Sequence, residues 1–543
     1  MSEILKDKSN CKKSSFFSFF SKEYSLNSIL VNLYLVAMFI IFPLYYTQQY
    51  SNIRHDKYDV FLVLSALLVV GEVFLLFALA SKGKAKENIS AYKTLTTTDY
   101  AMLALLFVYV VSTIFSAYRE DAFTGEAGRN NGCLIMIVYV AVYFIITREF
   151  SHWEYLFAAL ALGSGIVFLL AVLNFYYIDP LNMYVGYEPT DVEDFLSTIG
   201  NKNLVSSFIC VCLPALMLLF MNTKNKLLSV IYFIAEVLGF SALMVADSDS
   251  GYVGFFALLL LIFVYYIRKP SYMFKYFLSL FSMLLGAKVL FVFSVAAQGK
   301  VKELSSIPSF FVYTNGLSFA LIALTLVLCG VFFIIGRKNP EILLPKAIFY
   351  AAVAVVAACF LAVVYMIIKY TFIDTTSELN GILSYFRFDD KWGTHRGYIW
   401  RKSFEIFLDA NIKDKLIGCG PDTLVYPFSP FFAELASRFG NDSTNCAHNE
   451  YLNYLVTTGI LGLAAYLAVI ASFIVRAVKY AKYNPLIIVC AGSVICYSIQ
   501  AIANITQPIT TPLFILMLCI GEALCRQCKN KNTATKSQSV SNE

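Results

Sequence analysis

The sequence predicts an all-α protein that crosses a membrane about 12 to 14 times and carries one large loop outside the bilayer. Hydrophobic residues make up 59% of the 543 residues, charged residues make up only 14%, and the mean hydropathy is +0.67. That balance is typical of integral membrane proteins. Phe and Tyr are also abundant, and aromatic side chains favour the two interfaces of a bilayer.

Apolar runs of roughly the 20 residues that a helix needs to cross a bilayer recur along the whole chain. Fourteen such runs lie near residues 26–46, 59–80, 99–117, 131–147, 154–176, 204–221, 227–246, 251–267, 272–296, 316–335, 346–369, 451–475, 485–502 and 508–525. The last two are short, and Pro508 and Pro512 stand at their junction. Because proline interrupts helices, we predict about 12 to 14 spans rather than a fixed fourteen.

Lys and Arg are distributed unevenly between alternate connections, and this predicts the orientation, because cytoplasmic loops carry the excess. One side, which includes both termini and the basic loop at 82–93, holds 24 of these residues, whereas the short loops of the other side hold 7. We therefore expect a multi-pass protein of the inner (plasma) membrane with both termini in the cytoplasm. The segment from about 370 to 450 then faces outward.

This topology divides the chain into four parts. Residues 1–369 form an N-terminal transmembrane helix bundle, 370–450 the large extracytoplasmic loop, 451–526 the C-terminal transmembrane helices and 527–543 a disordered cytoplasmic tail. Connections of about 80 residues are uncommon in compact folds and usually carry function. Apolar side chains recur in the loop at helical spacing, which predicts an amphipathic helix on the membrane surface. They are Ile399, Trp400, Phe404, Phe407 and Leu408.

The composition argues against nucleic-acid binding and offers no metal or cofactor site. The net charge of +6 comes from Lys and Arg that are scattered between apolar runs instead of gathered on one face. Most of the 13 Cys lie in or near apolar runs, where Cys behaves as a small hydrophobe, and the single CxxC at Cys525 and Cys528 lacks the second pair of a zinc site. Cys419 and Cys446 both lie in the outer loop, where an oxidising compartment permits a disulfide between them; the alternative is that both stay free thiols.

The outer loop also holds the residues best suited to chemistry. His448 stands just before the span that follows the loop. An imidazole there can accept a proton near neutral pH, as activation of a sugar hydroxyl requires, and hydrogen bonding at the interface is the alternative role. Arg396 can bind phosphate oxygens through its planar guanidinium, unless it is a solvated surface residue. The glycines of Ile417–Pro421 permit a tight turn with exposed backbone N–H groups.

Together these residues resemble a known family. In order and spacing they are similar to the signature of the O-antigen ligase and polymerase superfamily: Arg396 and Trp400, Ile417-Gly418-Cys419-Gly420-Pro421, His448-Asn449-Glu450-Tyr451-Leu452 and Thr458-Gly459-Ile460-Leu461-Gly462. Two weaker landmarks lie upstream, in Phe123–Gly132 and Ile199–Asn203. The likeness runs from about 120 to 475, and its specific part from 394 to 462.

The resemblance implies a GT-C-like transferase that takes a glycan from an undecaprenyl-diphosphate carrier. The glycan passes to a lipid, cell-wall or protein acceptor outside the cytoplasm, without a metal or other cofactor. His448 would be the catalytic residue, acting as base on the acceptor hydroxyl, and Arg396 would hold the carrier diphosphate. Asn449 and Arg401 are further candidate substrate-binding residues. Ligases, polymerases and protein O-glycosyltransferases share these motifs, so the resemblance does not separate them.

One landmark of the family is missing. The family carries a Ser-Arg pair at the outer start of a middle span, where the Arg also contacts diphosphate, but the matching stretch Asp247–Tyr252 holds no Arg. Arg129, in a neighbouring outer loop, and Lys288, within a span, are candidate substrate-binding residues that would supply the lost charge. Asp247 and Asp249 suit either a divalent cation or the cap of the next helix.

A transporter is the rival class, because a lipid-linked glycan flippase would also have about 12 to 14 spans and buried charges. A flippase does not need an outer loop of about 80 residues with a His-Asn motif. The loop therefore favours an enzyme.

Overall fold

The computed structural model describes residues 25–81, 94–126, 129–313, 316–379, 381–440 and 443–541. Within these ranges the chain is almost entirely helical, and its strands, β1 (Phe195–Leu196) and β2 (Gly200–Asn201), form one short antiparallel ladder. The chain is thus an all-α polytopic membrane protein, as predicted. The basic residues of 1–24 and 82–93, on which much of the predicted orientation rests, lie outside the described residues.

Thirteen of the described helices are long and apolar enough to cross a membrane. They are α1 (Leu26–Leu44), α2 (Ile53–Ser81), α4 (Thr97–Phe115), α7 (Leu156–Phe175), α9 (Lys202–Asn222), α10 (Lys226–Ala246), α11 (Asp249–Tyr266), α12 (Pro270–Ala296), α14 (Gly316–Lys338), α15 (Lys346–Ile368), α21 (Gly459–Tyr480), α22 (Leu486–Gln500) with the turn η5 (Ala501–Ala503), and α23 (Thr511–Ser541). The remaining predicted run forms α6 (Cys133–Glu149), which is slightly shorter at 17 residues. Helices form here because a helix satisfies its backbone groups internally, as a bilayer requires.

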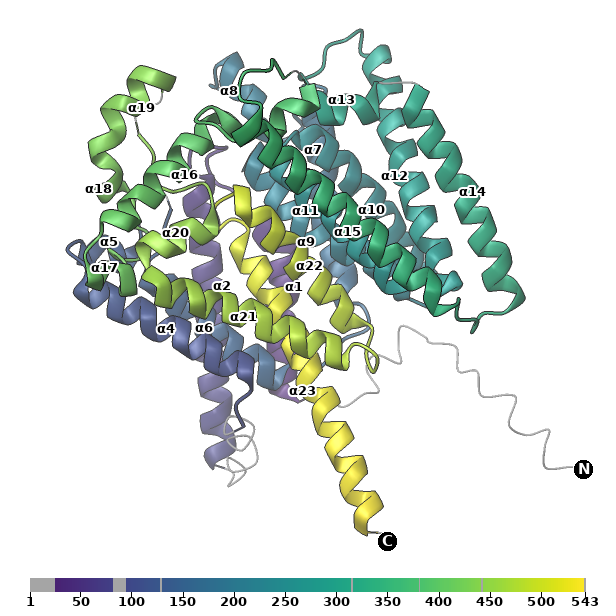
Figure 1. The fold of residues 1–543 in the computed structure, drawn as a ribbon. Helices are drawn as coiled ribbons and strands as arrows, with labels where there is room; N and C mark the ends of the chain where they lie inside the picture. The colour runs from purple at the N-terminus through teal and green to yellow at the C-terminus, as the bar shows by residue number, and fades with distance from the viewer. Residues whose placement is uncertain are drawn as a thin grey trace, which may run out of the picture.

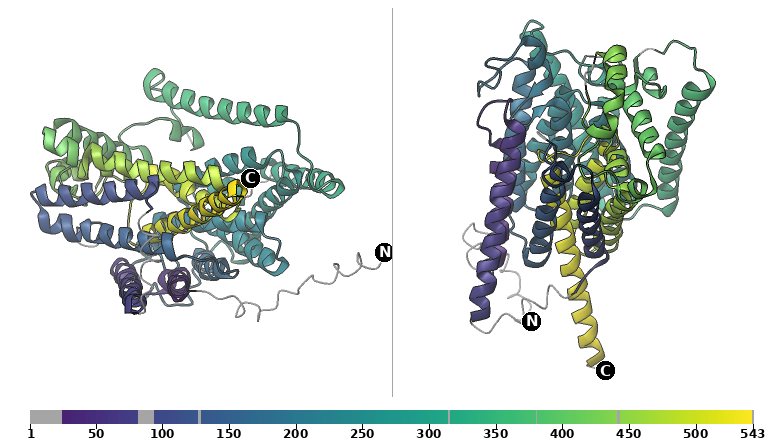
Figure 2. Two further views of the ribbon diagram at one scale, coloured as in Figure 1. Left: turned by 90° about the horizontal axis from the view of Figure 1, so that it is seen from below. Right: turned by 90° about the vertical axis from the view of Figure 1, so that its left-hand side faces the viewer.

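Burial differs sharply between the spans. The centre of the bundle is α9, which is buried along its length against α10, α11 and α22. The opposite case is α15, which is almost wholly exposed, and Figure 2 shows it standing apart from the other helices. An apolar helix of this kind faces lipid when the chain lies in a bilayer.

The C-terminal spans contain two breaks that the apolar runs do not reveal. The run predicted at 451–475 forms two helices, α20 (Glu450–Thr457) and α21, because the chain leaves the helical conformation at Thr458 and Gly459. The prediction of one continuous span is therefore wrong. Between η5 and α23 the polar segment 504–510 is not helical. Membrane proteins tolerate such breaks where the freed backbone groups are buried in protein.

The last helix continues beyond the end predicted near residue 526. Its bounds, Thr511–Ser541, include most of the segment predicted to be a disordered tail. Residues 527–541 contain neither Pro nor Gly, so nothing in the sequence interrupts the hydrogen-bond ladder of the helix. The boundaries of the four predicted parts otherwise stay predictions.

The loop between α15 and α20 folds into short helices, as predicted. They are η2 (Lys369–Ile373), η3 (Gly381–Phe386), α16 (Trp392–Asp409), α17 (Ile412–Ile417), α18 (Val425–Phe428), η4 (Ser429–Phe431) and α19 (Phe432–Phe439). The expected amphipathic helix is α16, in which Tyr398 and Ile399 are buried against Phe428 and Leu435.

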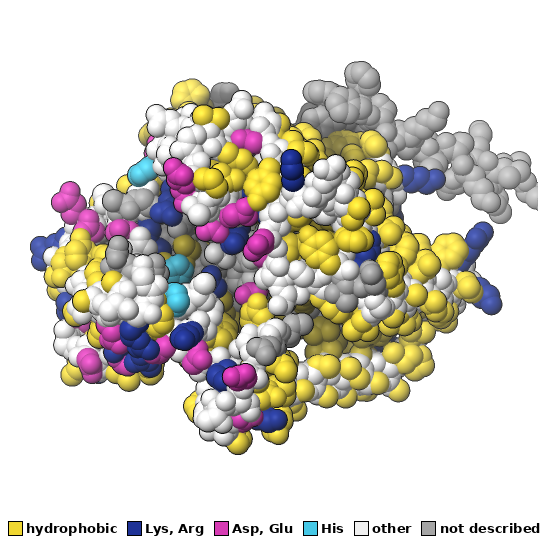
Figure 3. Space-filling view, turned by 90° about the horizontal axis from the view of Figure 1, so that it is seen from above, with side chains coloured by type: hydrophobic (Ala, Val, Ile, Leu, Met, Phe, Trp, Pro, Cys, Tyr) yellow, Lys and Arg dark blue, Asp and Glu magenta, His cyan; other side chains and the backbone are white. Residues whose placement is uncertain are grey.

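The loop helices lie at one end of the molecule. Figure 1 shows α16, α18 and α19 there, beside α5 (Arg119–Thr124), α8 (Pro189–Asp194) and α13 (Ser306–Val312), and the C-terminal end of α23 at the opposite end. Seen from above, charged and histidine side chains gather over the loop helices around a hollow, whereas much of the remaining surface is apolar (Figure 3). This polar end is therefore the part of the molecule at which water-soluble groups can react.

Candidate functional site

Two segments of the loop motif pack backbone against backbone. A Cβ atom on Gly418 would lie 2.2 Å from the Thr457 backbone, and one on Gly459 would lie 2.3 Å from the Leu416 backbone. Both glycines also have positive φ, +77° and +70°. Only glycine meets both conditions without strain, which explains why the motif has glycine at these positions. We call this contact the glycine joint.

Hydrogen bonds complete the glycine joint. The N–H groups of Cys419 and Gly420 donate to the carbonyls of Val456 and Thr457 at 3.2 and 3.0 Å. The Ser116 hydroxyl, at the end of α4, donates to the Cys419 carbonyl at 2.6 Å. The prediction that this turn exposes its N–H groups is therefore wrong, because the break in α20–α21 frees carbonyls that these N–H groups satisfy.

The segment before α20 holds His448 in a fixed place. The Ala447 N–H donates to Asn453 Oδ1 at 3.3 Å, and Asn449 Oδ1 accepts the Leu452 N–H at 3.0 Å as the N-cap of α20. His448 itself is half-buried and has φ of +48°, a conformation that costs energy in a residue with a Cβ atom. Asn449, a predicted substrate-binding residue, is thus the N-cap of α20 and directly follows the candidate base, His448.

Arg129 lies beside this segment but not on its open surface. Its side chain is buried, and Nε donates to Asp422 Oδ1 at 2.8 Å. Asp422 Oδ2 also accepts the N–H groups of Glu126 and Asn131, each at 3.1 Å, so the two loops are tied around one carboxylate. Arg129 is therefore part of the frame of the site.

Cys446 connects the two predicted catalytic residues. Its side chain is buried and lies within electrostatic reach of His448 and Arg129. Burial by itself raises the pKa of the thiol, but Arg129 and His448 together lower this pKa to about 6. Arg396 is also within electrostatic reach of Cys446. Arg396, Arg129 and His448 are thus each within electrostatic reach of Cys446. Cys419 and Cys446 are both free thiols.

A cavity of about 530 Å³ opens beside Arg396. Its charged lining comes from the start of α9, the α10–α11 junction and the η3–α16 segment, and consists of Lys202, Asp247, Asp249, Arg387, Asp389, Lys391 and Arg396. Burial lowers the pKa of Arg396, although Asp249 and Cys446 oppose that change. Among the described residues none forms a hydrogen bond or an ion pair with the Arg396 side chain. We call this space the outer cavity.

The two acidic residues of the outer cavity are engaged within the protein. Asp247 accepts hydrogen bonds from the backbone N–H of Ser305, at 2.9 Å, and from its hydroxyl, so it supports the start of α13. Asp249 accepts the Tyr385 hydroxyl at 3.0 Å. Of the two predicted alternatives, the structure therefore favours support of a helix start, but of α13 and not of the next helix α11. Within the described ranges no group of three His, Cys, Asp or Glu has the arrangement of a metal site.

Two other predicted substrate-binding residues lie outside the outer cavity. Lys288 Nζ donates to the Val312 carbonyl at 3.2 Å and lies 5.3 Å from the centre of the Phe319 ring, between α12, α13 and α14. Arg401 lies on the exposed face of α16, in ion pairs of 2.9 Å with Asp390 and with Glu405. Neither side chain is brought to Arg396.

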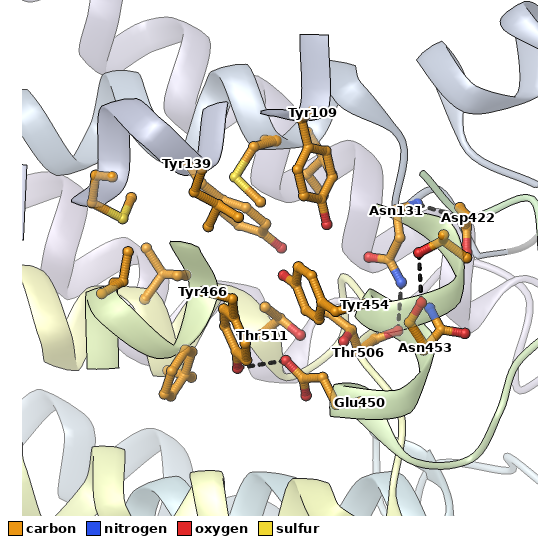
Figure 4. A pocket seen from close by; sticks show the side chains of 18 residues that line it. Tyr109, Asn131, Tyr139, Asp422, Glu450, Asn453, Tyr454, Tyr466, Thr506 and Thr511 are labelled. Carbon is orange, nitrogen blue, oxygen red and sulfur yellow. Dashed lines mark hydrogen bonds between the residues drawn. The ribbon is translucent and has the colours of Figure 1, made fainter. Parts of the chain in front are cut away.

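A small cavity next to Thr457 of the glycine joint is lined by Glu450, a motif residue to which the sequence analysis assigned no role. Figure 4 shows the hydroxyl groups of Tyr109, Tyr139, Tyr454 and Tyr466 around the same space. Glu450 Oε1 accepts the Tyr466 hydroxyl at 2.6 Å. Burial raises the pKa of Glu450 to about 7. The cavity, of about 30 Å³, has room for one or two water molecules but not for a sugar ring.

Comparison with known protein families gives a match that includes these residues. Residues 304–467 match the family described as O-antigen ligase, and this range includes Arg396, the glycine joint and His448. No curated protein matches the chain. The resemblance that the loop motifs indicated is therefore confirmed for residues 304–467, which match the O-antigen ligase family.

Proposed function

We propose that the chain is a membrane glycosyltransferase of the GT-C type that transfers a glycan from an undecaprenyl-diphosphate carrier to an acceptor outside the cytoplasm. The observation that carries the proposal is the open cavity beside Arg396, whose guanidinium lies, like His448, within electrostatic reach of Cys446. A transferase of this kind needs a cation for the diphosphate and a base for the acceptor. The helix bundle keeps the lipid tail of the carrier in the bilayer while the loop stands above it.

Arg396 is the diphosphate-binding residue in this proposal. Its guanidinium forms no hydrogen bond or ion pair with the described residues, and the planar fork matches two phosphate oxygens. The outer cavity, at about 530 Å³, is within the usual size of a ligand site. A fixed cation there stabilises the charge that develops on the diphosphate as the bond to the sugar breaks.

The cation that the family supplies from the Ser-Arg pair has two replacements in the outer cavity. Lys202, at the start of α9, and Lys391, just before α16, both line it. Lys202 forms a 3.0 Å ion pair with Asp194, but Lys202 is partly exposed and Asp194 is exposed, so this pair is weak enough to be exchanged for a phosphate. We assign the missing charge to these lysines and no longer to Arg129 or Lys288.

His448 is the base in this proposal. It takes the proton of the acceptor hydroxyl while the hydroxyl oxygen attacks the sugar carbon and the diphosphate leaves. Positioning and diphosphate stabilisation supply most of the rate enhancement. The chain would lie in the inner membrane with both termini in the cytoplasm, and the acceptor would be a lipid, a cell-wall fragment or a protein.

The test uses the full chain in proteoliposomes that contain undecaprenyl-diphosphate glycan, with a lipid, a peptidoglycan fragment and a peptide as acceptors. We expect release of the carrier diphosphate together with glycan transfer to one acceptor class. His448→Ala should abolish both, whereas His55→Ala, on an exposed histidine of α2, should keep the wild-type rate. Transfer by His448→Ala at the wild-type rate would contradict the assignment.

The role of Arg396 has a separate readout, the donor concentration at half-maximal rate. Charge-assisted hydrogen bonds contribute about 1.5–3 kcal/mol, so Arg396→Ala should raise that concentration roughly 10- to 150-fold. Lys402→Ala removes a charge from the same helix, where Lys402 pairs with Glu405 at 2.9 Å, and serves as the control. An unchanged donor dependence in Arg396→Ala argues against diphosphate binding. Movement of labelled carrier across the bilayer without diphosphate release would favour the flippase class.

A further inference from the structure

The short turn just before Arg396 has an unfavourable backbone conformation. Gly393, Thr394 and His395 are three consecutive residues with positive φ, +58°, +56° and +69°. This left-handed conformation is disfavoured in Thr394 and His395, because a Cβ atom there crowds the backbone. It persists only where the surrounding structure imposes it. Contacts around residues 393–395 therefore hold this turn, which we call the strained turn.

The two ends of the strained turn meet at a narrow neck. A Cβ atom on Gly397 would lie 1.9 Å from the Asp389 carbonyl oxygen, so the two backbones are in contact. The Tyr398 N–H donates to the Asp390 carbonyl at 3.2 Å. Arg396 directly precedes the neck and lines the outer cavity. The strained turn is thus a closed loop that places Arg396 against the outer cavity.

The Asp390 side chain closes the neck on its exposed side. Its carboxylate accepts Arg401 Nε and Nη2 of α16 at 3.0 and 2.9 Å, which is a bidentate pair. It also accepts Arg438 Nη2 of α19 at 2.7 Å. These side chains are partly exposed, and surface ion pairs stabilise a fold measurably where the geometry is bidentate or several charges form a network. Both conditions hold here, and we call these three residues the carboxylate clamp.

Ring contacts support the carboxylate clamp. The guanidinium groups of Arg401 and Arg438 lie 5.4 and 5.2 Å from the centre of the buried Tyr398 ring. The centre of the His395 ring, in the strained turn, lies 4.3 Å from that of Phe439, which follows Arg438. Helix α19 therefore contacts both the clamp and the turn, and the cations gain from the aromatic faces.

We propose that Asp390 is a positioning residue for the donor, because its carboxylate holds the strained turn that presents the Arg396 guanidinium to the outer cavity. This inference rests on the proposed role of Arg396 in diphosphate binding. Since the Arg396 side chain has no hydrogen bond or ion pair to the described part of the chain, the backbone of the turn sets where its guanidinium lies. A cation that is already in place binds diphosphate more tightly than one that must first be ordered. Arg401, predicted to bind substrate, then acts from outside the cavity as part of the clamp.

Hydrogen exchange tests the carboxylate clamp without any donor. The full chain in micelles is compared with Asp390→Asn, which keeps the size of the side chain and removes its charge. We expect the backbone amides of residues 390–398 to exchange several-fold faster in the variant. Glu405→Ala breaks the other 2.9 Å pair of Arg401 but leaves both bonds to Asp390, so it should exchange like wild type. Unchanged exchange in Asp390→Asn would overturn the proposal.

Donor binding supplies the functional readout. The probe is undecaprenyl diphosphate alone, and its half-saturating concentration is measured by tryptophan fluorescence, because Trp392 lines the outer cavity. Asp390→Asn should raise this concentration roughly 3- to 20-fold, less than Arg396→Ala, because the guanidinium is still present but less well placed. The rate of transfer at saturating donor should stay at the wild-type value. A lower saturating rate with unchanged donor binding would indicate altered packing at the site and overturn the inference.

A double-mutant cycle shows whether Asp390 acts through Arg396. If it does, Asp390→Asn should have no further effect on donor binding once Arg396→Ala has removed the guanidinium. If the two effects instead multiply, Asp390 acts elsewhere and the inference is wrong.

A second variant keeps the test informative if Asp390→Asn folds poorly. Arg438→Gln removes only the α19 half of the carboxylate clamp and should change hydrogen exchange and donor binding in the same direction, but less. No change in either quantity would contradict the proposal. If exchange and donor binding respond as expected but wild type transfers glycan to no acceptor, the proposed function fails while the role of Asp390 in donor binding stands.

Discussion

The buried ion pair between Arg129 and Asp422 offers a sharp test of how the outer loop is held. Removing the carboxylate in Asp422→Ala takes away the partner of Arg129 Nε at 2.8 Å and the oxygen that accepts two backbone N–H groups, each at 3.1 Å. The exposed fractions of the two side chains are only 2% and 1%, so water cannot replace the lost partner. The variant therefore leaves an uncompensated charge in the frame of the site.

The size of the effect follows from the burial. Breaking a buried pair from one side costs about 3–5 kcal/mol, because the remaining ion keeps its desolvation penalty without its partner. Replacing both ions by apolar groups costs much less, since the penalty and the attraction disappear together. The double variant Arg129→Met, Asp422→Ala should thus be more stable than Asp422→Ala alone, although it carries more substitutions.

The free energy of unfolding can be compared in mixed micelles across wild type, both single variants and the double variant. Glu405→Ala breaks an exposed 2.9 Å pair with Arg401 and should produce no measurable change. If Asp422→Ala unfolds within about 1 kcal/mol of wild type, the reasoning fails, because the pair then contributes no more than a surface pair. The reasoning would also be refuted if the losses of unfolding free energy in the two single variants added up to the loss in the double variant, because the prediction is that the two side chains are energetically coupled.

Three further predictions follow from burial and backbone geometry. Gly459→Ala should cost more than about 1–2 kcal/mol of unfolding free energy and speed protease cleavage of the loop, because φ is +70° and the new Cβ meets the Leu416 backbone at 2.3 Å. Glu450→Gln should flatten the pH dependence of the unfolding free energy. In wild type the pKa of Glu450 is raised from 4.5 to about 7, so the folded state loses up to about 3 kcal/mol of stability as the pH rises through 7. Unfolding of wild type and variant at pH 5 and 8.5 measures this difference. Asp99→Asn leaves Arg148 without its 3.0 Å partner, and should lower the unfolding free energy by about 3 kcal/mol without changing donor dependence.

The spans could be predicted from the sequence because a bilayer leaves the backbone few choices. Nearly every apolar run became one helix, and most of the helix ends lie within a few residues of those expected, with the start of α2 and the end of α23 as exceptions. The break before α21 could not be predicted in this way. The run at 451–475 is apolar on both sides of Gly459, and the reason for the break is a contact with Leu416, more than 40 residues earlier. Local hydropathy carries no information about such a contact.

The site could be predicted only where a motif marks it. His448 and Arg396 were predicted from their motifs, and both lie within electrostatic reach of Cys446. Asp422 was missed because its partner Arg129 is 293 residues away, and an isolated Asp in a loop reads as solvated. Lys288 and Arg401 were selected for charge alone, and each proved to have nearby partners inside the protein.

The two sides of the site are held with very different firmness, and this bears on how a lipid-linked donor reaches it. The His448 side is fixed by the glycine joint and by the buried Asp422 carboxylate. The Arg396 side is built on the η3–α16 segment, which follows α15, a helix with hardly any buried residues. Local stability follows burial, so the Arg396 side costs less to displace. In the proposed reaction, a donor that arrives through the bilayer would meet the more easily displaced wall of the outer cavity, while the proposed base, His448, would stay on the more firmly held side.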